Sequence, residues 1–233
     1  MFDSLFESVE ESRKRFTVYS SEETTDLGAQ LAAYNVDVTH RPLPSRGPDP
    51  FLVIEADGEF VGAISLSDLS TLFAPPVVRP DDVGDLSEGY RALFEALDNT
   101  LFTSMNRREL LAVSREIEDR AYRVGTGTLR ASFQSLSAFE PQVEVYRRLG
   151  GETDLDVHVH GAADWDPPDL PAVTYHRDSA GSLDRYWALA FVEGPQDGQF
   201  SALVARQDDE QYDGFWTDDA EATREVLATL ADA

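Results

Sequence analysis

An arginine-rich stretch carries the side chains in this sequence that are best suited to binding or chemistry. Residues 107–148 contain eight arginines against six acidic residues, although the whole chain of 233 residues has a formal net charge of -25. A segment that departs from the acidic bias either forms internal ion pairs or faces an anionic partner. Within it, Arg115 follows Ser114 and lies one helical turn before Glu118. A guanidinium at such a position can hold a carboxylate or a phosphate through two parallel hydrogen bonds.

The same spacing also fits a purely structural role. Side chains three or four residues apart are neighbours on a helix, so Arg115 is placed to pair with Asp119, and Glu116 with Arg120. Internal pairing and a ligand or partner site are therefore both open interpretations of this stretch.

Three histidines form a second group with chemical potential. Side chains alternate along a strand, so Asp156, His158 and His160 share one face, and His176 joins them if its strand pairs alongside. Such a set is a conceivable zinc or iron site. A polar strand face that simply meets water or a helix is the more frequent arrangement. We therefore predict no metal, with His158, His160 and His176 as the candidate ligands if one binds.

The residues that common enzyme mechanisms need are absent or unsuitably placed. The chain has no cysteine, which excludes disulfides, thiolate metal sites and cysteine catalysis. The sequence GGETD at residues 150–154 imitates the GGDEF signature of diguanylate cyclases, but its glycines are expected to end a helix. GTGT at residues 125–128 is too short for a nucleotide-binding glycine loop. We predict no catalytic residues and no enzyme activity; the alternative is a metal-dependent small enzyme that uses the face of His158 and His160.

The hydrophobic pattern predicts the elements that position these residues. Asn106 and Glu109 form a capping-box pattern, which predicts a helix that runs to about Arg123. Leu129, Phe133 and Leu136 recur at helical spacing and predict a further helix over 128–138. Strands are predicted over residues 155–160, 172–177, 185–192 and 199–206, the last two as a hairpin.

The chain is predicted to be α+β, with a smaller N-terminal α+β lobe over residues 1–85 and a main domain over residues 86–233. Residues 74–89, rich in Pro, Asp and Gly, mark the boundary. In the main domain a mainly antiparallel sheet is covered by helices. In the N-terminal lobe, two apolar runs joined through Asp57 and Gly58 predict a hairpin over residues 51–69. Short helices are predicted over residues 2–12, 24–34 and 90–97.

Several of these segments together resemble a known family. The most specific part is SREIEDRA at residues 114–121, followed by a glycine-containing turn and FQ at residues 133–134. The resemblance continues through LSAFEPQVEVYRRLG, VHVHG and GFWTDD. These segments are similar to the DICT sensory domain, which is named for its occurrence in diguanylate cyclases and two-component systems. The similarity covers residues 93–230, and haloarchaea carry stand-alone proteins of this type.

The resemblance implies a sensory, signal-input role without enzyme activity. Such a module binds a small ligand or a protein partner and relays to a signalling or regulatory protein; the family indicates no particular ligand or cofactor. A homodimer is compatible with this role, and an interaction protein that acts through the arginine-rich helices is a further alternative. The candidate residues for ligand or partner contact are Arg107, Ser114, Arg115, Glu118, Phe133, Gln134 and Trp216.

The ratio of basic to acidic residues also indicates the salt concentration in which the protein works. Lys14 is the only lysine, against 18 arginines and 44 acidic residues. An acidic, lysine-poor surface is typical of proteins from the cytosol of salt-accumulating halophiles. At molar salt, screening makes the repulsion between acidic side chains small. The negative charge argues against nucleic-acid binding. The acidic start lacks the pattern of a signal peptide, and no apolar run approaches a membrane span, so we expect a cytoplasmic protein without membrane contact.

This composition predicts a steep dependence of stability on salt. The melting temperature should rise between about 0.1 M and about 3 M KCl, because the Debye length falls from about 10 Å to below about 3 Å and carboxylate repulsion is screened. Differential scanning calorimetry across this range measures the effect. A melting temperature that stays flat would contradict the halophilic interpretation.

Overall fold

The computed structural model shows an α+β chain built on two sheets that are mostly antiparallel, as predicted. Parts of the predicted helices over 24–34 and 90–97, Asp57 of the predicted turn, and the whole boundary segment 74–89 lie outside the described residues. The division into domains at residue 85 stays a prediction. The residues that the structure describes are 1–11, 14–21, 31, 34, 36–44, 46–56, 58–67, 97–98, 100–194 and 198–233.

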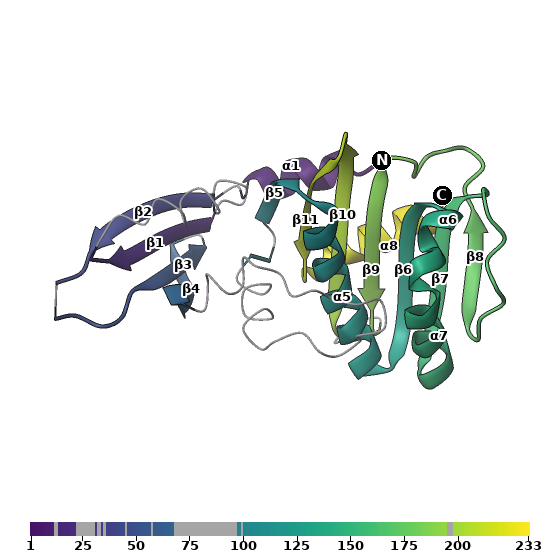
Figure 1. Ribbon diagram of the computed structural model, residues 1–233, viewed down its shortest axis with the longest axis horizontal. Helices are drawn as coiled ribbons and strands as arrows, with labels where there is room; N and C mark the ends of the chain where they lie inside the picture. Colours follow the sequence, from purple (N-terminus) through teal and green to yellow (C-terminus); the bar gives the residue numbers. More distant parts are fainter. Residues whose placement is uncertain are drawn as a thin grey trace.

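The larger sheet has seven strands in the order β5-β11-β10-β9-β6-β7-β8 (Figure 1). Neighbours from β5 to β6 are antiparallel, whereas β6, β7 and β8 run parallel. The predicted hairpin is confirmed as the antiparallel pair β9 and β10. The strands are β5 (Thr100–Met105), β6 (Thr126–Ser135), β7 (Asp154–Ala162), β8 (Val173–Arg177), β9 (Tyr186–Val192), β10 (Phe200–Asp208) and β11 (Gln211–Thr217).

Helices cover both faces of this sheet, because its central strands carry apolar side chains on both faces. One face contacts α5 (Arg107–Val124) and the segment α6 (Leu136–Phe139), η1 (Glu140–Gln142) and α7 (Val143–Glu152). The other contacts α1 (Asp3–Glu11) and α8 (Ala220–Ala231). Figure 1 shows α5 and α7 in front of the sheet and α8 behind it. Among the helices that the structure describes, none is both long and apolar enough to cross a membrane.

The smaller sheet has four strands in the order β2-β1-β3-β4. Strands β1 and β2 are parallel, and the predicted hairpin is confirmed as the antiparallel pair β3 and β4. Its buried side chains, among them Phe16 and Leu52, belong to the same hydrophobic cluster as one face of the larger sheet. The strands are β1 (Lys14–Ser20), β2 (Val36–Pro42), β3 (Phe51–Ala56) and β4 (Glu59–Ser65).

The single lysine connects the two sheets. Lys14 begins β1, is 7% exposed, and donates a hydrogen bond from Nζ to the carbonyl oxygen of Asp98, which precedes β5. The Asp98 carboxylate in turn accepts from the backbone N–H of Asp218 at 2.7 Å. Burial, and the negative charge of Asp218 beside it, raise the pKa of Asp98 to about 6. A buried cation is thus held at the junction by main-chain and acidic groups.

One predicted helix is wrong: residues 128–138 are mostly strand. Strand β6 continues to Ser135, and only Leu136–Phe139 is helical. Leu129, Ala131 and Phe133 alternate into the core, and β6 is bonded to β9 on one side and to β7 on the other. The two-residue alternation therefore fits the fold better than the spacing of three and four that indicated a helix.

The paired glycines of α7 also differ from expectation. Gly150 and Gly151 do not terminate the helix, which continues to Glu152 and is capped by Thr153. A Cβ at Gly150 would overlap the carbonyl oxygen of Pro171, whereas a Cβ at Gly151 meets nothing within 4 Å. Gly150 is therefore required for the close approach of the loop before β8, and Gly151 is not.

Alanine at these two positions should have opposite effects. Gly150→Ala should lower the free energy of unfolding by about 1–3 kcal/mol, because the loop at Pro171 must move. Gly151→Ala, the matched control, should leave it unchanged or raise it by up to about 1 kcal/mol, because alanine is the better helix former. Denaturant melts in molar KCl compare the two. Equal effects would show that the loop does not press on α7.

Candidate functional site

Helix α5 carries most of the predicted site residues, and both of its ends are fixed. The predicted capping box is confirmed: the Asn106 side chain accepts from the backbone N–H groups of Arg108 and Glu109 at 2.9 and 3.1 Å, and Glu109 Oε2 accepts from the Asn106 N–H at 2.8 Å. Gly125 ends the helix with a φ of 74°. The side chains between are therefore held in one register against the sheet.

Arg115 lies inside the protein. Its side chain is 2% exposed, and its two terminal nitrogens donate to Glu118, also 2% exposed, and to the Gln142 side-chain oxygen of η1. The guanidinium is therefore bound by a carboxylate on its own helix and by an amide from the segment that follows β6. Burial, and the charge of Glu118, raise the pKa of nearby Tyr146 well above its ordinary value, so its phenol is neutral.

Other charged side chains of α5 are paired as well, with partners different from those that the spacing suggested. Asp119 is bound by Arg123. Arg123 also lies 3.5 Å from Glu116. Arg120 reaches across to Asp218, before α8, at 2.5 Å. The pairs of Arg123 thus lie within α5, and the pair of Arg120 joins the helix to the segment before α8.

The remaining candidate on this part of the helix is also internal. Ser114 is 1% exposed and donates from Oγ to the Leu110 carbonyl oxygen at 3.0 Å. Ser114, Arg115 and Glu118 lie together as predicted from the helix, but they face the interior. Contact of these three with a ligand stays a prediction that requires the helix to move.

Arg107, Phe133 and Gln134 meet at the end of the larger sheet where α5 begins. Phe133 is in register with Trp187 of β9. The Arg107 guanidinium lies over the Trp187 ring, 5.5 Å from its centroid. Gln134 Nε2 donates to Gln207 Oε1 of β10 at 2.8 Å. We call these five residues the Arg107 site.

The Arg107 site contains polar groups that have no hydrogen-bond acceptor or ionic partner among the described residues. Trp187 is 4% exposed, and its indole N–H finds no acceptor among the described residues. Arg107 is exposed and forms no ion pair with any described residue. Gln134 has a φ of 62°, at a point where the pairing of β6 with β7 shifts between Ser132 and Ser135. Non-glycine residues held in this region of φ concentrate at binding sites.

Trp216 lies apart from this group. It is 2% exposed, pairs with Thr100 of β5, and contacts the rings of Phe102 and Tyr34 at centroid distances of 5.7 and 6.3 Å. Sequence reasoning missed Trp187 and Gln207. Their place beside Phe133 and Gln134 depends on β6 being a strand, and the helix predicted there concealed it.

The prediction that three histidines share a strand face is confirmed. His160 and His176 are in register on β7 and β8, with rings stacked 4.3 Å apart. His158 contacts His176 Nε2 through Nδ1 and Asp156 Oδ2 through Nε2, both at 2.9 Å. Burial, with the neighbouring His176 and Arg130 charges, lowers the pKa of His160 to about 3. His158 and His176 contact each other through their nitrogens, and the described residues include no group arranged to hold a metal ion.

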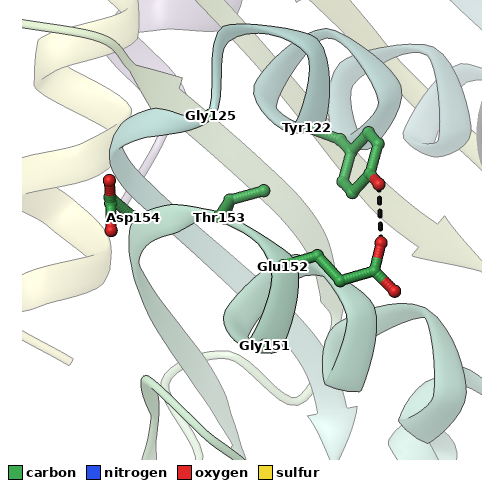
Figure 2. Close-up of a pocket in the computed structure, with 6 residues that line it drawn as sticks. All are labelled: Tyr122, Gly125, Gly151, Glu152, Thr153 and Asp154. Carbon is green, nitrogen blue, oxygen red and sulfur yellow. Dashed lines mark hydrogen bonds between the residues drawn. The ribbon is translucent and has the colours of Figure 1, made fainter.

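Two hollows flank α5 away from the Arg107 site. Figure 2 shows the first, of about 500 Å³, at the end of α5, where Tyr122 Oη donates to Glu152 Oε2 at 2.6 Å. It is lined by the last four residues of the GGETD sequence, which run from the end of α7 to the start of β7. The second, of about 460 Å³, lies between α5 and β10 and includes Arg120, Arg123 and Asp218. Its charged groups take part in the ion pairs described above.

The family of the chain follows from comparison with known families. The family model for the sensory domain in diguanylate cyclases and two-component systems, DICT, matches residues 91–208, half of the chain. The chain belongs to the DICT family. The matched part of this DICT protein contains α5, the Arg107 site and the histidine face, whereas the GFWTDD sequence lies beyond it.

Other comparisons add little to the description of this DICT protein. No curated protein matches its sequence. Among solved structures, polyphosphate kinase from Porphyromonas gingivalis is similar at a TM-score of 0.39 and 11% identity, over 99% of this chain and 48% of the kinase chain. The DICT protein thus spans about half the length of that chain.

Removing a buried charge from α5 should destabilise the DICT protein strongly. We expect Arg115→Ala and Glu118→Gln each to lower the free energy of unfolding by about 3–5 kcal/mol, because the partner is left buried without its counter-charge. The control is Arg147→Ala on α7, whose exposed pair with Glu144 is worth about 0–1 kcal/mol. Denaturant melts in molar KCl measure the three. Small losses for Arg115 and Glu118 would instead favour a ligand-contact role.

Proposed function

We propose that this DICT protein is a signal-input module without catalytic function, which binds a small ligand or protein partner at the Arg107 site and relays binding to a signalling or regulatory protein. Membership of a sensory-domain family supports the role. One structural observation carries the location: an exposed guanidinium without an ionic partner among the described residues covers a buried indole whose N–H lacks an acceptor there.

The chemistry of the Arg107 site indicates what it accepts. A guanidinium donates to carboxylates and phosphates and also stacks on planar rings. An acceptor atom that reaches Trp187 would satisfy the indole N–H, whose burial without a partner is unfavourable. The amides of Gln134 and Gln207 stand at the edge of the same site. The proposed ligand therefore combines an anionic group with a flat, partly apolar body.

The position of Arg107 suggests how binding is relayed. Arg107 is the first residue of α5, and the same helix is tied to η1 through Arg115 and to the start of α8 through Arg120. A shift of α5 on ligand binding would displace both contacts together. A relay of this kind is a change in population between two arrangements of one rigid element.

Native mass spectrometry of protein purified from its own host tests the proposal. The wild-type protein should retain a bound small molecule or partner chain, and Arg107→Gln should lose it, since the cation that holds the anionic group is gone. Arg108→Gln is the matched control, because Arg108 is the next residue and is likewise exposed.

Two results would contradict the Arg107 site. One is a bound species that both variants retain equally. The other is wild-type protein that carries no additional mass. Thermal melts of both variants establish that any loss of binding is not a loss of folding.

A further inference from the structure

The histidine face lies on the opposite side of the larger sheet from α7. Three of the four histidines of the chain, His158, His160 and His176, gather there with Arg130 of β6. Their strands alternate, so the neighbouring valines Val157 and Val159 enter the core on the other face. The whole chain has a net charge of -25, so this cluster of basic side chains differs from the acidic character of the rest of the protein.

The hydrogen bonds determine which nitrogen of His160 carries its proton. Arg130 Nη1 lies 3.3 Å from His160 Nε2, and a guanidinium only donates, so Nε2 accepts. The proton of the neutral ring is then on Nδ1. His160 is 1% exposed, and Nδ1 has no partner among the described residues. A buried N–H donor therefore stands without an acceptor.

Arg130 is incompletely satisfied as well. Its Nε is buried and finds no acceptor in the described part of the chain, and its Nη1 contacts the neutral His160 ring. No described carboxylate forms an ion pair with it. A partly buried guanidinium without a carboxylate in direct contact is energetically unfavourable, and the charge of Asp156 offsets only part of that cost. Burial accordingly lowers the pKa of Arg130.

The acidic groups nearby are already engaged. Asp178, which follows β8, accepts from the backbone N–H groups of Ala180, Gly181 and Leu183 at 2.8 to 3.0 Å. Asp156 Oδ2 accepts from His158 Nε2 at 2.9 Å. Neither carboxylate bridges to Arg130. The acceptor that the guanidinium lacks must come from outside these residues.

We propose that this face binds a small oxyanion, a phosphate or carboxylate group, on the Arg130 guanidinium beside the stacked rings of His160 and His176. Arg130 is partly exposed, and its planar fork matches two oxygens of such a group. The stacked rings of His160 and His176 form the wall beside it. The site is separate from the Arg107 site, which lies on the other face, and does not depend on it.

Nuclear magnetic resonance of the imidazole nitrogens provides a direct test on the full chain. The probes are sulfate, which stands in for phosphate, and acetate, each titrated at constant ionic strength in KCl. In wild type without a probe, the spectrum should show His160 protonated on Nδ1 and His158 on Nε2. Sulfate or acetate should then shift the His160 and His176 signals to saturation, and the tighter of the two identifies the class of oxyanion.

Variants locate the anion. Arg130→Gln should weaken sulfate binding at least about tenfold, equal to about 1.4 kcal/mol. Arg177→Gln is the matched control, since Arg177 is adjacent to His176 on β8 but points elsewhere and pairs with Asp166 at 2.8 Å. Arg130→Lys keeps the charge without the fork, so it should bind measurably but more weakly than wild type if the glutamine variant does not fold.

Three outcomes would overturn the site. The first is a linear, non-saturating response of the imidazole signals to both anions. The second is equal binding by wild type, Arg130→Gln and Arg177→Gln. The third is a wild-type spectrum with His160 protonated on Nε2, which would contradict the contact from Arg130 Nη1 that places the guanidinium beside the histidine rings.

Discussion

The buried guanidinium of Arg115 holds two helical segments, α5 and η1, in place against each other. Arg115 is bound by Glu118 within α5 and by Gln142 from η1. The chain leaves α5 for β6, which lies between β9 and β7 in the sheet, and returns through α6 and η1 on the same face of the sheet. Because a buried charge must keep its partners, this contact fixes the distance between α5 and the returning segment. Both the Arg107 site at one end of α5 and the hollow at the other are placed by it.

Some charged side chains of this protein are paired with each other, and others have no oppositely charged partner among the described residues. Acidic side chains dominate the composition, and Arg115, Arg120 and Arg123 of α5 pair with acidic groups of the protein itself. Even the single lysine is buried at the junction with the smaller sheet. Arg107 and Arg130 depart from this pattern, since neither has a carboxylate partner among the described residues. These two cations are where we propose that external anions bind.

Local signals in the sequence predicted well the features that depend on local interactions. The capping box at Asn106 and the hairpin of β9 and β10 were both correct, because a cap or a tight turn involves only neighbouring residues. The shared face of His158 and His160 followed from strand alternation alone. The α+β class was likewise evident from the order of the elements.

The errors arose where neighbours distant in sequence decide the structure. The leucines and phenylalanine of residues 129–136 fit a helical stripe as well as a strand, and pairing with β9 and β7 selected the strand. That error also hid two contacts: Trp187, which pairs beside Phe133, lies under Arg107 of α5, and Arg130 reaches His160 across the paired strands β6 and β7. The burial of Arg115 was one of two open interpretations, since spacing on a helix does not reveal which side meets the core.

The internal ion pairs of α5 have a further consequence for a chain this acidic. Salt screens charges in contact with water far more than it screens charges inside the protein. Removing salt would thus increase the repulsion between exposed carboxylates and destabilise the outer elements, while the buried contact between Arg115 and Glu118 persists. The last backbone amides to exchange with deuterated water, as salt is diluted, should then be those of α5 and the strands beneath it. The sensory fold would lose its outer layers first and retain a charged helix as its final ordered element.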